Sequence, residues 1–258
     1  MKIAKFSKYI LRKLLPGKYH SMLRNYLLKI IYSSATYRES GFITEFNCDF
    51  MKDERFKQAY SLGKLTGSWG DGDNHWRTFV VCWAAQQCIN KEGDFVECGV
   101  NRGGFAISVL SYTKLHDTKK KFYLLDTFEG LVDSQITDQE RKNGVHSKGF
   151  VNCWDDVCTT FSKFDKTVQL IKGIIPETLG EVKSEKISFL SIDLNCAYPE
   201  IAAAEFFWDK LVSGGIIVLD DYGWPTRSVQ KLAFDNFSRK RGVEVLALPT
   251  GQGLIIKP

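Results

Sequence analysis

From residue 94 onwards, apolar runs of strand length alternate with segments of helical pattern. The candidate strands span residues 94–98, 121–126, 168–172, 187–193 and 215–220. The helical patterns lie near residues 103–115, 151–163, 176–184, 199–212 and 226–241. Such alternation is typical of βαβ units, which build a parallel sheet covered by helices on both faces. The chain is therefore expected to form an α/β domain.

The end of the chain breaks this alternation. Residues 243–248 and 252–257 are two β-rich runs joined by a short turn, which predicts an antiparallel hairpin. A Rossmann-like parallel sheet closed by a C-terminal hairpin differs from the usual nicotinamide-binding arrangement. It resembles the class I S-adenosylmethionine (SAM) methyltransferase fold, here with an N-terminal helical extension.

Three carboxylates follow two of the predicted strands. Asp220 and Asp221 come directly after the apolar run 216–219, and Asp193 ends the strand before it. In an open parallel sheet, ligands bind just beyond the carboxyl ends of the strands. Three acids at one edge suit a hard divalent cation. The alternative is that Asp220 or Asp221 only caps the following turn.

Two further acids end the first and second strands. Glu97 is followed by a glycine turn containing Gly99 and Gly103, and glycine is needed where backbone approaches a ligand closely. The spacing is neither that of a P-loop nor G-x-G-x-x-G. Asp126 is suited to accept both hydroxyls of a ribose. These acids predict a nucleoside-bearing cofactor, and an acidic rim favours a cationic sulfonium over a pyrophosphate. Arg102, beside the turn, either steers an acidic group or pairs with a nearby carboxylate.

Four segments together resemble the family of metal-dependent sugar O-methyltransferases typified by macrocin, mycinamicin and novobiocin-sugar methyltransferases. They are residues 93–104, 125–130, 190–193 and 214–223, in the order and spacing of the family. The resemblance implies a SAM- and Mg²⁺-dependent O-methyltransferase that acts on a hydroxyl of a sugar or glycosylated acceptor. A catechol-like acceptor, or a SAM- or glycan-binding module without catalysis, remain alternatives.

The resemblance also implies which residues do the work. Asp193, Asp220 and Asp221 would hold Mg²⁺, and the Lys172–Ile174 turn, with Gly173 and Ile174, would flank the adenine. The residues that would hold or border SAM lie in the first two motifs: Glu97, Gly99, Arg102, Gly103, Asp126, Thr127 and Phe128.

One position departs from the family. Relatives commonly carry Asp-x-Asp after the fourth strand, but this chain has Asp193-Leu-Asn195, and an amide cannot take a proton. Either another group is the base, or the metal beside Asp193 does most of the activation of the acceptor hydroxyl. His75 and His146 lie in irregular segments that could cover a pocket, and they are the candidate bases; the alternative is that both are surface residues. Glu200 is another candidate, although charge compensation at a helix N-terminus suits it better.

The N-terminal part differs from the rest in charge. Residues 1–38 contain nine Lys or Arg and no acid, whereas the remainder is net acidic. Residues 1–90 are expected to form a basic helical extension or lid, and residues 91–258 the methyltransferase domain. The amphipathic segment 3–15 either packs on its own domain or a second subunit of a homo-oligomer, or it lies on an anionic membrane surface. Nucleic acid is not an expected partner.

Composition points to a cytoplasmic protein with reduced thiols. The seven cysteines are an odd number without a C-x-x-C pair, so they predict core thiols rather than disulfides or a zinc site. No apolar run reaches the ~18 residues of a spanning helix, and there is no signal peptide of the usual form. Peripheral membrane contact through the basic N-terminus stays open.

Overall fold

The computed structural model describes residues 34–39 and 41–258, and the chain divides into two compact units, 1–48 and 49–258. In the first unit, β1 (Tyr37–Glu39) and β2 (Phe42–Thr44) form a short antiparallel hairpin. The basic amphipathic segment expected at 3–15 lies outside the described residues.

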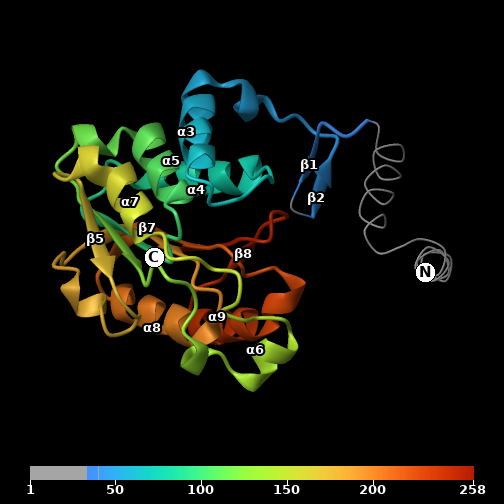
Figure 1. The fold of residues 1–258 in the computed structure, drawn as a ribbon, viewed down its shortest axis with the longest axis vertical. Coiled ribbons are helices and arrows are strands. Elements are labelled where there is room, and N and C mark those ends of the chain that lie inside the picture. Colours follow the sequence, from blue (N-terminus) through green and yellow to red (C-terminus); the bar gives the residue numbers. More distant parts are fainter. Residues whose placement is uncertain (1–33, 40) are drawn as a thin grey trace. The chain divides into compact units, whose positions relative to one another are not determined.

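The second unit is built on one mixed sheet with the strand order β5-β4-β3-β6-β7-β9-β8 (Figure 1). The five parallel strands are β3 (Asp94–Cys98), β4 (Phe122–Asp126), β5 (Val168–Lys172), β6 (Ile187–Ile192) and β7 (Leu211–Leu219). The hairpin strands β8 (Leu246–Ala247) and β9 (Gly253–Ile256) add an antiparallel edge, with β9 against β7. The predicted parallel sheet closed by a C-terminal hairpin is confirmed.

Helices cover both faces of this sheet (Figure 1). On one side lie α3 (Glu54–Leu65), α4 (His75–Cys88), α5 (Gly104–Thr113) and α7 (Trp154–Phe161). On the other lie α8 (Ala197–Trp208) and α9 (Ser228–Arg241), while α6 (Asp138–Lys142) lies within the long connection from β4 to α7. Single 3-10 turns include η3 (Asp133–Gln135) and η6 (Pro225–Arg227).

One predicted helix is absent. The segment 176–184 forms only the 3-10 turn η5 (Leu179–Glu181). Gly180 lies at the centre of this nine-residue segment, and glycine is ~1 kcal/mol less favourable than alanine inside a helix. A segment this short has too few helical hydrogen bonds to offset that cost.

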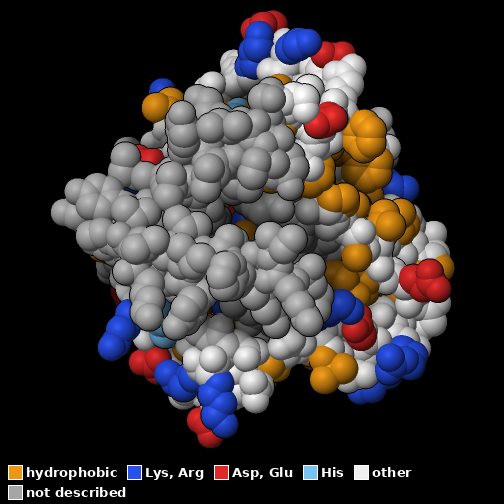
Figure 2. All heavy atoms as spheres, turned by 90° about the vertical axis from the view of Figure 1, so that its right-hand side faces the viewer, with side chains coloured by type: hydrophobic (Ala, Val, Ile, Leu, Met, Phe, Trp, Pro, Cys, Tyr) orange, Lys and Arg blue, Asp and Glu red, His pale blue; other side chains and the backbone are white. Residues whose placement is uncertain are grey.

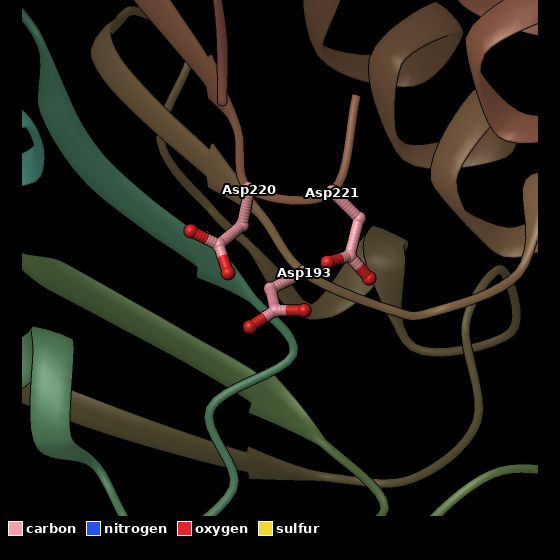
Figure 3. Close-up of side chains that lie close together, drawn as sticks. All are labelled: Asp193, Asp220 and Asp221. Atoms are coloured by element: carbon pink, nitrogen blue, oxygen red, sulfur yellow. The ribbon is translucent and has the colours of Figure 1, made fainter. Parts of the chain in front are cut away.

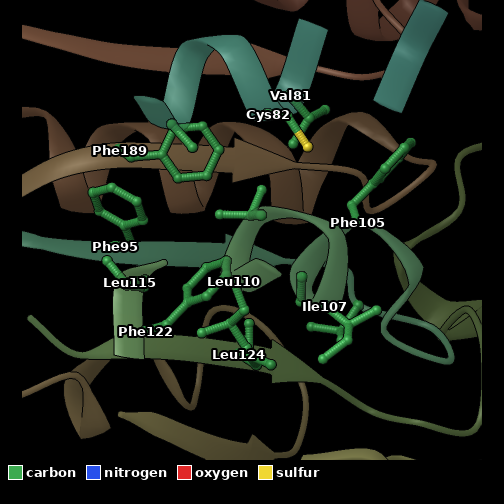
Figure 4. Close-up of a cluster of buried hydrophobic side chains, with 14 of the residues drawn as sticks. Val81, Cys82, Phe95, Phe105, Ile107, Leu110, Leu115, Phe122, Leu124 and Phe189 are labelled. Carbon is green, nitrogen blue, oxygen red and sulfur yellow. The ribbon is translucent and has the colours of Figure 1, made fainter. Parts of the chain in front are cut away.

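Strand residues alternate between two hydrophobic layers. On one face, Phe95, Phe122 and Phe189 pack with Cys82 of α4 and Leu110 of α5 (Figure 4). On the other face, strand residues such as Val96, Leu190 and Ile217 pack with aromatic residues of α8 and α9. Both faces are buried, which explains why the strands read as continuous apolar runs.

Helices α3 and α4 belong to the compact unit, although the sequence suggested an N-terminal extension there. Helix α3 approaches α5 so closely that a Cβ at Gly63 would lie 2.3 Å from Ser108 Oγ. Its start is capped by Asp53, whose carboxylate accepts a hydrogen bond from Phe56 N at 2.9 Å. The lid role of residues 1–90 remains a prediction.

The surface and the thiols add two observations. Figure 2 shows one face of the molecule, and on its described part Lys and Arg side chains are interspersed with Asp and Glu. All seven cysteines are free thiols and five are buried, as predicted. Within residues 34–39 and 41–258, no helix is long and apolar enough to cross a membrane.

Candidate active site

Asp193, Asp220 and Asp221 converge at the carboxyl ends of β6 and β7. Each offers a carboxylate oxygen within 4.8 Å of the others, and Figure 3 shows the three side chains gathered around one point. The cause is the parallel register, in which Ile192 pairs with Leu219, so that the residues following both strands emerge side by side. The predicted grouping of these acids is therefore present.

Two arginines compensate part of this negative charge. Arg77 of α4 donates from Nε to Asp220 Oδ1 at 3.2 Å, and its Nη2 pairs with Asp220 Oδ2. Arg227, at the end of η6, donates from Nε to Asp221 Oδ2 at 3.1 Å. Asp220 is only 1% exposed, and a carboxylate buried this deeply requires such pairing. The sequence reasoning missed both arginines.

Asp193 is the least compensated of the three acids. Loss of hydration, followed by the negative charge of Asp221, raises the pKa of Asp193 to about 7, although Arg77 and Arg227 oppose the shift. Asn195 Nδ2 donates to Asp193 Oδ1 at 3.0 Å and Asn195 Oδ1 accepts from Arg227 Nη2 at 2.6 Å. Asn195, at the position where this sequence departs from the family pattern, thus links the Asp193 carboxylate to the Arg227 guanidinium.

A cavity adjoins the acidic cluster and contains much of the predicted cofactor site. Its lining includes Asp193 and Asn195, and five residues predicted to hold or border SAM: Gly99, Asp126, Thr127, Phe128 and Gly173. The lining also contains residues that were not named as candidates. Asn101 and Gly130 lie within the motif segments 93–104 and 125–130, and the others lie outside these two segments: Leu131, Val132, Gln135, Phe150, Val151, Cys153, Ile175, Leu194, Cys196 and Pro199.

Asp126 ties the glycine turn to the end of β4. Its Oδ2 accepts hydrogen bonds from Val100 N at 2.6 Å and Asn101 N at 2.7 Å, and its Oδ1 accepts from Phe128 N at 2.7 Å. The Thr127 hydroxyl lies 3.3 Å from Oδ1, but its single hydrogen has a closer acceptor in Gly130 O at 2.7 Å. An ionised carboxylate has about four acceptor positions, so Oδ1 then keeps one for a ligand hydroxyl. Asp126 therefore both fixes the glycine turn and lines the cavity beside it.

Glu97 is buried beside these acids. It is 1% exposed, and its Oε2 has no hydrogen-bond partner among the described residues. Burial, with smaller contributions from Asp193 and Asp126, raises its pKa well above the ordinary value. Buried acceptors without partners are rare, and this one lies at a strand end where a ligand would approach.

Gly99 and Gly103, the two glycines of the turn after β3, allow close packing. Gly99 has a φ of +90°, and a Cβ there would lie 1.9 Å from the carbonyl oxygen of Asp193. A Cβ at Gly103, whose φ is +84°, would lie 2.6 Å from the Phe161 ring. Glycine is required at both positions because the chain passes so close to its neighbours.

Other predicted residues lie outside the cavity lining. Arg102 Nη1 is paired with Asp156 Oδ2 at 2.5 Å, which fits the pairing alternative. Ile174 is exposed, and its neighbour Ile175 lines the cavity instead. Glu97 and Gly103 are also absent from the lining.

The candidate bases are placed as follows. His146 is exposed, and its Nδ1 lies 3.2 Å from Lys148 O. His75 begins α4 and stacks on Tyr60 with ring centroids 3.8 Å apart; burial is the main cause that lowers its pKa. Neither imidazole lines the cavity. Their role as bases therefore stays a prediction.

Glu200 has a supporting role. It lies in the first turn of α8, and its Oε1 accepts from Leu194 N at 3.2 Å, Asn195 N at 3.0 Å and Gln230 Nε2 at 2.8 Å. Asn195 has a φ of +61°, a left-handed conformation that asparagine tolerates. Glu200 thus holds the turn that presents Asp193 and Asn195.

Residues 72–246 match the family model of macrocin O-methyltransferases (TylF). The chain belongs to this family. It is 28% identical over 138 residues to 8-demethyl-8-(2,3-dimethoxy-alpha-L-rhamnosyl)-tetracenomycin-C 4'-O-methyltransferase of Streptomyces olivaceus, covering 50% of this chain and 53% of that protein. It is 25% identical over 151 residues to demethyldecarbamoylnovobiocin O-methyltransferase of Streptomyces niveus, covering 53% and 58%. The chain thus spans a little over half the length of these curated relatives.

Solved structures confirm the fold class. The O-methyltransferase NovP has a TM-score of 0.65 at 20% identity, covering 76% of this chain and 88% of NovP. The calicheamicin methyltransferase CalS11 has a TM-score of 0.59 at 16% identity, covering 78% and 91%. The family member therefore has the class I SAM methyltransferase fold that the sequence predicted.

Proposed function

We propose that this member of the macrocin O-methyltransferase family transfers a methyl group from SAM to a hydroxyl of a sugar or glycosylated acceptor, with Mg²⁺ held by Asp193, Asp220 and Asp221. The observation that carries the proposal is the convergence of these carboxylates beside a cavity that Asp126 lines. Two relatives support the acceptor class, since they are named for a rhamnosyl tetracenomycin and for demethyldecarbamoylnovobiocin.

The cavity fits a nucleoside with a cationic sulfur. Asp126 Oδ1 keeps an acceptor position for a ribose hydroxyl, and the partly exposed apolar residues Leu131 and Val132 of the lining offer surface for an adenine ring. Glu97, Asp193 and Asp126 make the surroundings acidic, which favours a positively charged ligand. SAM, when bound there, would supply the methyl group.

The acidic cluster fits a divalent cation. The three carboxylate oxygens lie within 4.8 Å of one another, and small side-chain rotations would bring them to the ~4.2 Å or less that separates two ligands of an Mg²⁺ ion bound at ~2.1 Å. Burial, followed by the negative charge of Asp221, raises the pKa of Asp193 to about 7, and a bound cation would favour its ionised form. A cation there would lower the pKa of an acceptor hydroxyl and so make it a better nucleophile.

Other residues would position the acceptor and exclude water. Asn195 and Glu200 hold the turn that carries Asp193. Phe150 and Val151 line the cavity from the long connection after β4 and would shield it from solvent. A bound acceptor oxygen would be oriented for in-line attack by this enclosure. His75 and His146 are retained as proposed acceptors of the hydroxyl proton, with solvent as the alternative route.

We also propose that the protein forms a homo-oligomer, lies in the cytoplasm and can contact a membrane surface through its basic N-terminus. A catechol-like acceptor would use the same metal site, and an inactive binding module would keep the cavity without turnover. A panel of acceptors distinguishes these cases.

The test is radiolabelled methyl transfer from SAM to sugar nucleotides, glycosides and catechols, with Mg²⁺ or with a chelator. We expect Mg²⁺-dependent methylation of a sugar hydroxyl, and loss of turnover but retention of S-adenosylhomocysteine binding in Asp221→Asn. Asp165→Asn, at an exposed position, is the matched control and should be fully active. Turnover that survives unchanged in Asp221→Asn would refute the metal assignment.

A further inference from the structure

Gln252 lies directly opposite the acidic cluster. It precedes β9, and the antiparallel pairing of Leu219 with Gly253 sets it against Asp220, the residue that follows β7. Its side chain is 0% exposed. The C-terminal hairpin, which closes the sheet, therefore also delivers one buried amide to the proposed metal site.

The amide of Gln252 is fixed at both ends. Its Nε2 donates to Asp220 Oδ1 at 2.9 Å and to the carbonyl oxygen of Arg77 at 3.3 Å. Its Oε1 accepts from the Thr250 hydroxyl at 2.9 Å. A rotated amide would place an oxygen against Asp220 Oδ1 and the Arg77 carbonyl, so only one orientation satisfies all the partners.

These contacts decide how Asp220 can bind a cation. Oδ1 receives two hydrogen bonds, one from Gln252 Nε2 and one from Arg77 Nε at 3.2 Å, and these use both of its lone pairs. Oδ2 is paired with Arg77 Nη2 and keeps a second lone pair. Asp220 is thereby held with Oδ2 as the oxygen available to a metal.

We propose that Gln252 is a positioning residue that orients Asp220 for binding a divalent cation; this rests on the metal site of the proposed function. Because Gln252 is neutral, its removal leaves the charge of the site unchanged and acts through orientation alone. Hydrogen-bond partners of metal ligands typically contribute ~10–100-fold to metal affinity or activity.

Calorimetric titration of the full chain with Mn²⁺ tests the role. Gln252→Met keeps a similar length and removes all three hydrogen bonds, and it should raise the Mn²⁺ dissociation constant by ~10-fold or more. The dissociation constant of S-adenosylhomocysteine, titrated in parallel, should stay unchanged, whereas a general folding defect would weaken both ligands. Thr226→Val, at an exposed position, is the control and should match the wild type.

A second variant keeps the inference testable if Gln252→Met fails to fold. Thr250→Val removes only the hydroxyl that fixes the amide, and it should weaken Mn²⁺ binding in the same direction by a smaller factor. Equal Mn²⁺ affinity in the wild type and in either folded variant would overturn the positioning role. A wild-type chain that binds no Mn²⁺ would instead overturn the proposed metal site, and the inference with it.

Discussion

Replacing Gly99 by alanine should destabilise the protein through a clash with Asp193. The new Cβ would lie 1.9 Å from the carbonyl oxygen of Asp193 and 2.5 Å from its carbonyl carbon, whereas ordinary contacts begin at 3.4 Å. The ends of β3 and β6 would therefore have to separate. The φ of +90° adds backbone strain, because alanine disfavours the left-handed region.

The size of the effect follows from these two contributions. Left-handed backbone costs a residue with a Cβ about 1–2 kcal/mol, and overpacking typically costs about 1–3 kcal/mol. The sum, about 2–5 kcal/mol, corresponds to a fall in melting temperature of roughly 4–20 °C for a domain of this size. The displaced Asp193 should also bind Mn²⁺ more weakly.

Two other glycines separate the contributions. Gly144 has a φ of +95° but open space around its Cβ position, so Gly144→Ala measures the backbone strain alone. Gly180 also has open space and lacks a positive φ, so Gly180→Ala should change little. Thermal unfolding followed by circular dichroism compares the three variants. The reasoning is refuted if Gly99→Ala melts no lower than Gly144→Ala.

Three further outcomes are expected. The pKa of Glu97 is raised in the folded state, so its carboxylate lowers the stability of the protein at pH values above its unfolded pKa of ~4.3. Glu97→Gln should therefore melt higher than the wild type at pH 8, melt no differently at pH 4, and bind S-adenosylhomocysteine more weakly. Unchanged melting at pH 8 would count against this. Glu200→Ala leaves the Leu194 and Asn195 amides without their acceptor, at about 1–3 kcal/mol each, and urea titration should reveal the loss; a change under 1 kcal/mol would contradict it. Arg227→Met should melt lower in a chelator and gain more from added Mg²⁺ than the wild type, because the cation then compensates Asp221; an equal gain would exclude this.

The fold was predictable because each strand is marked by a short pattern of neighbouring residues in the sequence. The run 187–192 is buried at every position and is apolar except for Ser188 and Ser191, as expected for a strand covered on both faces, and turns mark its ends. The grouping of Asp193 with Asp220 and Asp221 followed from parallel strands ending at one edge. The helix expected at 176–184 does not form, because the central Gly180 and the short length of the segment both disfavour a helix.

The residues that complete the site were not predictable in the same way. Arg77 lies 143 positions before Asp220, on a helix whose orientation depends on tertiary packing. Gln252 is an unremarkable polar residue in a hairpin, and only the pairing of β9 with β7 reveals its partner. Arg227 could have been noticed, since it is a cation in the turn that follows the acidic pair.

The most direct test of the central claim is anomalous diffraction from crystals grown with Mn²⁺ and S-adenosylhomocysteine. We predict a manganese peak within bonding distance of Asp193, Asp220 and Asp221, with the nucleoside in the adjacent cavity and its ribose at Asp126. A manganese peak elsewhere, or a nucleoside bound away from Asp126, would contradict the proposed active site.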